Sequence, residues 1–230
     1  MKEEQQSTQK HQPEEIGQKH FLNLKYKKYF RKSSIKNITE GNLFLKEINN
    51  INPKTFFEIG IFQGVLAKNV CDLMFNNHGL NFKYYGVDIF ETDEIYKNEI
   101  APSLKINNPL KRLYFKYIKK YNPYSIEAVE DLLKDYKNNI KLIKGNSNTA
   151  LKDINIKNID LIFIDGGHDY NTVKNDLNFS KKIISHNGTI LCDDYNLTYA
   201  EGVKKAIDEF IKENTCKHEI LLERFVKINL

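Results

Sequence analysis

Short apolar runs alternate with longer amphipathic segments along most of the 230-residue chain. The apolar runs indicate buried strands, and the segments with an apolar residue every three or four positions indicate helices. The predicted strands cover residues 55–60, 83–90, 140–147, 159–166, 189–195, 218–223 and 224–230. The predicted helices cover residues 41–51, 64–77, 125–139, 170–186 and 201–214. Strands that alternate with helices favour βαβ units and a parallel sheet with helices on both faces.

Three segments depart from this alternation. Residues 1–18 are polar, and we expect a disordered tail because they offer too little apolar surface to order themselves. Residues 19–54 are predicted to form a basic, aromatic and helical lead. Residues 91–124 are irregular, polar and aromatic, which indicates an insertion after the second strand of the main domain, residues 55–230.

The composition excludes several classes of protein. Hydrophobic residues make up 40% and charged residues 28% of the chain, which is typical of a globular domain. No apolar run approaches the roughly 20 residues of a membrane-spanning helix, and the first residues contain no apolar signal core. The cysteines, Cys71, Cys192 and Cys216, are odd in number and widely spaced, which argues against a disulfide framework. We therefore expect a cytoplasmic protein without a membrane span.

The net charge of +5 is concentrated near the beginning of the chain. No acid occurs from Ile16 to Thr39, and Phe and Tyr residues interleave with the basic residues there. These basic residues are Lys19, Lys25, Lys27, Lys28, Arg31, Lys32 and Lys36. One interpretation is an arm that binds nucleic acid or another anionic surface. The other, which we favour, is a solvated amphipathic helix that packs its aromatic residues on the main domain.

Polar residues follow each of the five predicted parallel strands at the point where the strand ends. They are Glu58 with Gly60, Asp88, Gly145-Asn146-Ser147, Asp165, and Asp193-Asp194. In open α/β sheets, ligands bind beyond the carboxyl ends of the strands. The pattern therefore predicts a binding site along this edge of the sheet.

The first strands end in residues that suit a nucleotide-like ligand. Gly60 and Gly64 allow a tight turn and a close approach of the backbone to a ligand, although such a turn can also be purely structural. Glu58 suits a cationic group such as an amine or a sulfonium. Asp88 can accept hydrogen bonds from both hydroxyls of a ribose, and its alternative role is a helix cap or a turn. Residues 145–147 could bind a purine edge or form a plain turn.

The last two parallel strands end in acids that we expect to converge. If these strands are neighbours, Asp165, Asp193 and Asp194 meet, and three close carboxylates need protons or a bound cation. Oxygen ligands favour a hard cation such as Mg²⁺. His168 lies near the same place and has a reference pKa of about 6.5, so it can accept a proton near neutral pH. The alternatives are a cap and loop network for the acids and a packing or orienting role for His168.

These residues resemble a known family. The stretches "FFEIGIFQG", "YGVDIF", "IKLIKGNS", "LIFIDGGHDYNTVKNDL" and "GTILCDDY" are similar to the class I S-adenosylmethionine-dependent methyltransferases. More narrowly, they resemble the bacterial branch that includes the macrocin-type sugar O-methyltransferases, and the match runs from about Thr55 to the end of the chain. The resemblance implies a Rossmann-like, doubly wound, seven-stranded sheet with an antiparallel last strand. It also implies that Glu58 and Gly60 hold the methionine end of the cofactor and that Asp88 holds its ribose.

The metal-dependent catechol-type O-methyltransferases share this core fold and suggest further roles. Their first metal aspartate corresponds to Asp165, and their Asp-Asn pair corresponds to Asp193-Asp194. Their catalytic lysine falls where this chain has His168, so the identity of the base stays open. The expected cofactor-binding residues are Glu58, Gly60, Gly64, Asp88, Asn146, Ser147 and Asp165. The expected metal ligands are Asp165, Asp193 and Asp194, and the expected catalytic residues are His168 and Asp165.

The leading hypothesis is an O-methyltransferase that acts on a sugar or another small polar acceptor, with S-adenosylmethionine and a divalent cation such as Mg²⁺. A nucleic-acid methyltransferase is one alternative, but the nearest match to its usual motif, "NPYS" at Asn122, lacks a proline and lies in the insertion. A metal-dependent glycosyltransferase is another, and it does not explain Glu58 and Asp88. A cofactor-binding module that lost catalysis is a third alternative, and the intact set of Asp165, His168, Asp193 and Asp194 argues against it. A homo-oligomer is left open.

Overall fold

The structure is a computed structural model, and it describes residues 25–90, 106–198 and 200–230. Seven strands form one sheet in the order β3-β2-β1-β4-β5-β7-β6. They are β1 (Thr55–Ile59), β2 (Lys83–Asp88), β3 (Ile140–Lys144), β4 (Ile159–Ile164), β5 (Ile184–Cys192), β6 (Lys217–Leu221) and β7 (Phe225–Asn229). β1 to β5 are parallel, and β7 is antiparallel to both of its neighbours. The predicted seven-stranded, mostly parallel sheet with an antiparallel last strand is confirmed.

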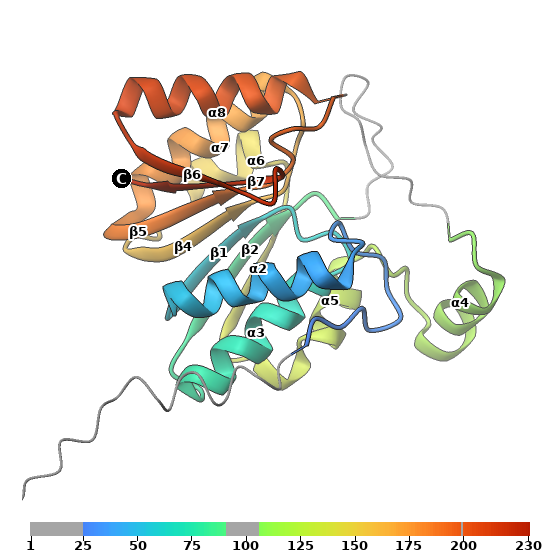
Figure 1. Cartoon of the computed structure of the whole chain (residues 1–230). Coiled ribbons are helices and arrows are strands. Elements are labelled where there is room, and N and C mark those ends of the chain that lie inside the picture. Colours follow the sequence, from blue (N-terminus) through green and yellow to red (C-terminus); the bar gives the residue numbers. More distant parts are fainter. Residues whose placement is uncertain (1–24, 91–105, 199) are drawn as a thin grey trace, which may run out of the picture.

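Helices lie on both faces of the sheet (Figure 1). One face carries α2 (Ile38–Ile51), α3 (Val65–His78) and α5 (Ile126–Leu132), followed by the short η2 (Lys134–Tyr136). The other face carries α6 (Ser147–Ala150) with η3 (Leu151–Asp153), α7 (Tyr170–Ile183) and α8 (Glu201–Asn214). α4 (Pro109–Leu113) continues into the π-helix η1 (Tyr114–Lys119), away from the sheet (Figure 1). None of the helices in the described residues is long and apolar enough to cross a bilayer.

The strands β1 to β5 and β7 supply side chains to two separate cores because successive residues point to opposite faces. Phe56 belongs to the core under α2, α3 and α5, and Phe57 belongs to the core under α7 and α8. The same alternation sends Phe163 and Leu191 to the first core and Ile164 to the second. This alternation also determines to which face of the sheet the side chain of the residue after each strand points.

Several predicted element boundaries were wrong. The helix predicted for residues 170–186 ends at Ile183, and β5 begins at Ile184 without a loop. Two consecutive isoleucines suit both elements, so the apolar pattern could not mark the change. The helix predicted for residues 125–139 gives way after Leu132 to a short 3-10 turn, and the strand predicted for residues 83–90 ends at Asp88.

In the part of the lead that the structure describes, residues 25–54, the helix is confined to the second half. Residues 25–37 form no helix, and α2 begins at Ile38 with Asn37 as its cap. Tyr26 is nevertheless buried in the core, so an aromatic side chain of the lead does pack on the main domain. The tail predicted for residues 1–18 and the first part of the insertion, residues 91–105, lie outside the described residues.

Candidate active site at the carboxyl ends of the strands

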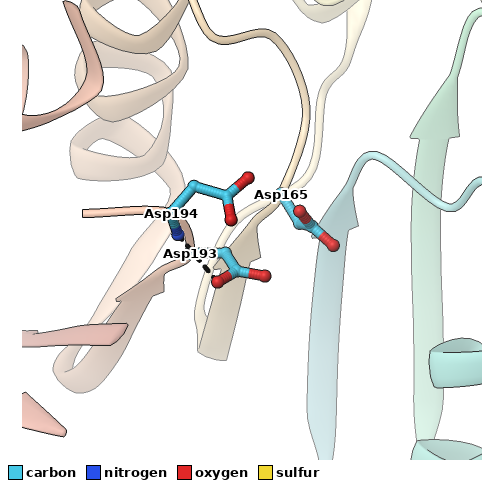
Figure 2. A group of neighbouring side chains, drawn as sticks. All are labelled: Asp165, Asp193 and Asp194. Carbon is cyan, nitrogen blue, oxygen red and sulfur yellow. Dashed lines mark hydrogen bonds between the residues drawn. The ribbon is translucent and has the colours of Figure 1, made fainter. Parts of the chain in front are cut away.

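The pairing of β4 with β5 brings three aspartates together. Ile164 pairs with Cys192, so Asp165 and Asp193 follow side by side at the ends of the two strands. One carboxylate oxygen from each of Asp165, Asp193 and Asp194 lies within 4.8 Å of the other two, and Figure 2 shows the three side chains together. This acid cluster is the grouping that the sequence predicted, and its oxygens are the donor type that Mg²⁺ prefers.

Arg224, which sequence analysis missed, holds one member of the cluster. Its Nε and Nη2 donate to the two oxygens of Asp193 at 2.5 and 2.6 Å. Its Nη1 donates to Glu40 of α2 at 3.3 Å, and its Nη2 lies 3.8 Å from Asp194. Arg224 lies between β6 and β7, so the antiparallel hairpin returns a cation to the carboxyl edge of the parallel strands.

Burial and mutual repulsion make the acids in this cluster hard to ionise. Burial and then the charges of Asp193 and Asp194 raise the pKa of Asp165 well above its usual value. Burial raises the pKa of Asp193 to about 6, although the hydrogen bonds from Arg224 oppose the shift. Burial works to lower the pKa of Arg224, but its bonds to Asp193 outweigh this and raise it. Among the described residues, Arg224 is the arginine or lysine that pairs with acids of this cluster, so the acid cluster could accept a further cation.

His168 lies beside the acid cluster on the loop between β4 and α7. Its Nε2 is 2.9 Å from Oδ2 of Asp194. Asp169, the next residue, caps α7 by accepting hydrogen bonds from the backbone of Asn171 and Thr172. A cavity of about 10 Å³, enough for about one water, lies against His168 and the cluster. Asp169 therefore has a structural role, and His168 faces the cluster.

Gly60 brings the loop after β1 against the loop after β4. Its φ of +94° favours glycine, and a Cβ there would lie 2.0 Å from the carbonyl oxygen of Asp165. Gly64, with φ +74°, precedes α3. Gly60 is therefore required by close backbone packing beside the acid cluster. The loop from Gly60 to Gly64 lies at the carboxyl edge of the parallel strands, as the acid cluster does.

Glu58 is fully covered by protein. It is 1% exposed, and its Oε2 accepts a hydrogen bond from the hydroxyl of Tyr84 at 2.5 Å. Burial raises the pKa of Glu58 to about 8, so it holds a proton at neutral pH in the absence of a cationic partner. A cationic group beside it would favour the ionised form.

Asp88 binds the backbone of the surrounding loops. Its Oδ2 accepts hydrogen bonds from the amides of Ile61 and Phe62 at 2.6 and 2.8 Å, and its Oδ1 accepts one from Phe90 at 2.5 Å. A carboxylate has about four acceptor positions, so three of them are in use. Two ribose hydroxyls could bind together only if one of these amides withdrew.

Asn146 and Ser147 lie at the end of β3 and start a helix. Asn146 caps α6 by accepting a hydrogen bond from the backbone of Asn148 at 2.9 Å, and Ser147 is the first residue of that helix. The Asn146 side chain therefore has a structural role as a helix cap. This agrees with the second of the two roles considered for residues 145–147, a turn without a ligand.

The lead closes over the loop after β1. Arg31 is 6% exposed and donates to the carbonyl oxygens of Ala128 at 2.8 Å and Gln63 at 3.4 Å. The amide of Lys32 donates to the Gln63 side chain at 2.7 Å, and the Ser34 carbonyl accepts from Arg224 at 3.5 Å. The segment from Arg31 to Ser34 thus connects the glycine loop with the acid cluster.

Comparisons with known proteins identify the family and the fold of the chain. Residues 57–195 match the model of a family described as a methyltransferase domain. The fold is similar to the O-methyltransferase NovP, with 16% identity, a TM-score of 0.58 and coverage of 80% of this chain and 75% of that one. It is also similar to a Bacillus cereus O-methyltransferase in complex with S-adenosylhomocysteine, with 12% identity, a TM-score of 0.55 and coverage of 94% and 89%.

A further similarity comes from sequence alone. The chain is 29% identical over 195 residues to the small ribosomal subunit protein uS2c of Toxoplasma gondii, which covers 76% of this chain and 81% of that protein. Asn, Ile and Lys are abundant in this chain, which raises its chance identity with any sequence of similar composition. The family match instead spans the strands and loops that form the candidate site. The chain belongs to the methyltransferase-domain family and has the fold of the S-adenosylmethionine-dependent O-methyltransferases.

Proposed function

We propose that this chain transfers a methyl group from S-adenosylmethionine to a hydroxyl of a sugar or another small polar acceptor, assisted by a divalent cation. The observation that carries the proposal is the acid cluster with His168 beside it, next to the glycine loop after β1. Amine methylation needs no such group of oxygen ligands, whereas a hydroxyl must lose its proton before or during methyl transfer.

The residues at the ends of β1 and β2 suit the cofactor. Glu58 would regain its charge beside the cationic methionine end, and Asp88 would accept hydrogen bonds from the ribose once one backbone amide releases it. When bound, S-adenosylmethionine supplies an activated methyl group. Since in-line placement of the acceptor oxygen can account for much of the rate, we assign the protein chiefly a positioning role.

The acid cluster suits a hard divalent cation. Asp165 and Asp194 would bind it together with Asp193, which would have to share its oxygens between the cation and Arg224. When bound, the cation lowers the pKa of an acceptor hydroxyl. His168 would then accept the proton, and Asp194 would hold the imidazole in place through its contact with Nε2.

The test is release of S-adenosylhomocysteine from a panel of acceptors, with EDTA and then with Mg²⁺ restored. The panel contains nucleotide sugars, free sugars, catechols, small amines, RNA and DNA. We expect turnover with a sugar or another small hydroxyl acceptor, loss of turnover in EDTA and recovery with Mg²⁺. Turnover confined to amines or nucleic acids would contradict the acceptor class, and full activity in EDTA would contradict the role of the cation.

The alternatives have less support. Family membership favours methyl transfer over glycosyl transfer. The basic lead, which motivated a nucleic-acid substrate, uses Tyr26 and Arg31 for internal contacts. The cysteines Cys71, Cys192 and Cys216 are free thiols, and the cytoplasmic location stays a prediction from the sequence.

A further inference from the structure

The helix formed by α4 and η1 carries an unusual amount of exposed apolar surface. Leu110 and Ile118 are each 70% exposed, Tyr117 is 61% exposed and Leu113 is 51% exposed. The spacing from Leu110 to Leu113 is one helical turn, and the longer turn of a π-helix brings Tyr117 and Ile118 to the same side. These four residues form an apolar stripe on one side of the helix.

The opposite side of this helix is fixed to the protein. Phe115 is 4% exposed, and its ring lies 5.6 Å from the guanidinium of Arg31. Tyr114 meets Phe30 of the lead edge-to-face, with 5.8 Å between ring centroids, and Nζ of Lys111 lies 4.8 Å above Phe30. The apolar stripe is therefore held outward by contacts on the other side.

The surroundings of the apolar stripe are strongly basic. Residues 106–121 contain five basic residues and no acid, and residues 25–37, which contact them, contain six and no acid. The whole chain carries only +5, so the rest of the molecule is net acidic. Arg31 is buried, and Lys119 pairs with Asp131 at 2.6 Å, so the other nine basic residues make up the cationic surface of the two segments. We call this cationic surface, together with the apolar stripe, the basic apolar surface.

We propose that the basic apolar surface docks the protein on an anionic lipid bilayer. An amphipathic helix with apolar residues on one side and Lys and Arg around them lies in the plane of the bilayer interface. Anionic lipids attract such basic clusters, and the aliphatic side chains enter the boundary with the acyl chains. The helix would lie on the bilayer, in keeping with the absence of a spanning helix among the described residues.

Other occupants fit this surface less well. Nucleic acid binds basic grooves through phosphates and base stacking, but three of the four residues in the apolar stripe are aliphatic. A second copy of the chain would bring a second dense positive charge against the first. The chain's own residues 91–100 contain four acids and one lysine, so this acidic segment is another possible occupant of the basic apolar surface. The experiment must therefore distinguish it from a lipid bilayer.

The experiment measures binding of the full chain to vesicles by flotation. We expect binding to vesicles of phosphatidylcholine with 30% phosphatidylglycerol (on the order of the anionic content that supports such binding) and little binding to phosphatidylcholine alone. Arg112→Gln/Lys116→Gln/Lys120→Gln should weaken binding about 100-fold, at about 1 kcal/mol for each charge. Leu110→Ser/Leu113→Ser/Ile118→Ser should weaken it at least about tenfold.

Control variants carry changes of the same kind elsewhere on the surface, one apolar substitution and three charge substitutions. Leu80→Ser removes an aliphatic side chain that is 66% exposed, and Lys152→Gln/Lys157→Gln/Lys182→Gln removes three exposed charges. Both should bind like the wild type, and thermal melts establish that every variant is folded. The proposal would be overturned if the Arg112/Lys116/Lys120 variant and the Leu110/Leu113/Ile118 variant both bound vesicles as the wild type does.

Three other results would also overturn it. The first is retention of RNA or DNA without vesicle binding, and the second is self-association that the Leu/Ile variant abolishes. The third is that the wild type does not bind vesicles, whereas a variant with Glu91, Asp93, Glu94 and Glu99 neutralised does. This result would indicate that the chain's own acidic segment occupies the basic apolar surface. Vesicle binding needs no methyl acceptor, so its outcome is independent of the proposed activity.

Discussion

Arg224 and Asp193 form a two-pronged ion pair, with Nε 2.5 Å from Oδ1 and Nη2 2.6 Å from Oδ2. Asp193 is 3% exposed, so its charge is held in a place where water cannot replace the arginine. The proposed cation would have to share this carboxylate. The strength of this proposed cation binding would therefore depend on Arg224, which is not itself a proposed ligand.

Replacement of Arg224 tests this competition. Arg224→Gln removes the competing charge, so we expect the affinity for Mn²⁺, measured by electron paramagnetic resonance, to rise about tenfold, equivalent to about 1.4 kcal/mol. Without metal, the free energy of unfolding should fall by about 3–5 kcal/mol, because one partner of a buried pair is removed. Added metal should restore part of this loss.

The control for this experiment lies on β7. Lys227→Gln removes the ion pair of Lys227 with Glu47, whose atoms are 2.5 Å apart and whose side chains are 21% and 19% exposed. It should leave Mn²⁺ affinity unchanged. Failure of both the wild type and Arg224→Gln to bind Mn²⁺ would contradict the metal site.

The proposed roles of His168 and Asp194 can be distinguished by measuring both activity and metal binding in the same variants. His168→Ala should lower turnover about 10²–10⁴-fold, as expected for loss of a general base, while Mn²⁺ affinity changes little. Asp194→Asn should lower both, because Asp194 is proposed to bind the cation and to orient His168. His186→Ala, a change of an exposed histidine on β5, is the control. A pH–rate profile that His168→Ala leaves unchanged would assign His168 a structural role.

The role of Asp88 in cofactor binding needs a control for its backbone contacts. Asp88→Ala should weaken S-adenosylmethionine binding by about 1–3 kcal/mol in calorimetry, because the ribose loses a charged acceptor. Asp160 likewise accepts two backbone hydrogen bonds, both at 2.9 Å, but it lies near the start of β4 at the other end of the strands. Asp160→Ala should cost stability and leave cofactor affinity intact. Equal cofactor affinity in the two folded variants would remove Asp88 from the site.

Glu58 should make stability depend on pH in the absence of cofactor. Its pKa of about 8 in the folded protein exceeds the ordinary value of 4.5, so the folded state binds the proton more tightly. The stability from this group is therefore complete below about pH 4.5 and declines as pH rises to about 8. Glu58→Gln keeps an acceptor for Tyr84 but cannot ionise.

The measurement is the free energy of unfolding from urea titrations between pH 5 and about 8. The wild type should lose up to about 1.4 kcal/mol per pH unit more than Glu58→Gln, which corresponds to one proton. Parallel curves for the two proteins would show that Glu58 is ionised throughout this range in the folded state.

The acid cluster could be predicted because it depends on regular geometry. Parallel neighbouring strands with ends in register place Asp165 beside Asp193, and the alternation of faces sends both the same way. Arg224 and Ser34 could not be predicted, since they reach the site through a hairpin and an irregular lead that no periodicity describes. The end of α7 was misplaced for a related reason, because Ile183 and Ile184 suit a helix and a strand equally.

The position of β7 has a consequence for the order in which the protein can fold. β7 follows β6 in the chain, yet it lies between β5 and β6, and among the described strands β6 pairs with β7 alone. Until β7 pairs with β5, β6 cannot join the sheet, and Asp193 lacks Arg224. A folding intermediate without the β6-β7 hairpin therefore exposes the edge of β5 and an uncompensated group of acids, and docking of the hairpin covers both in one step.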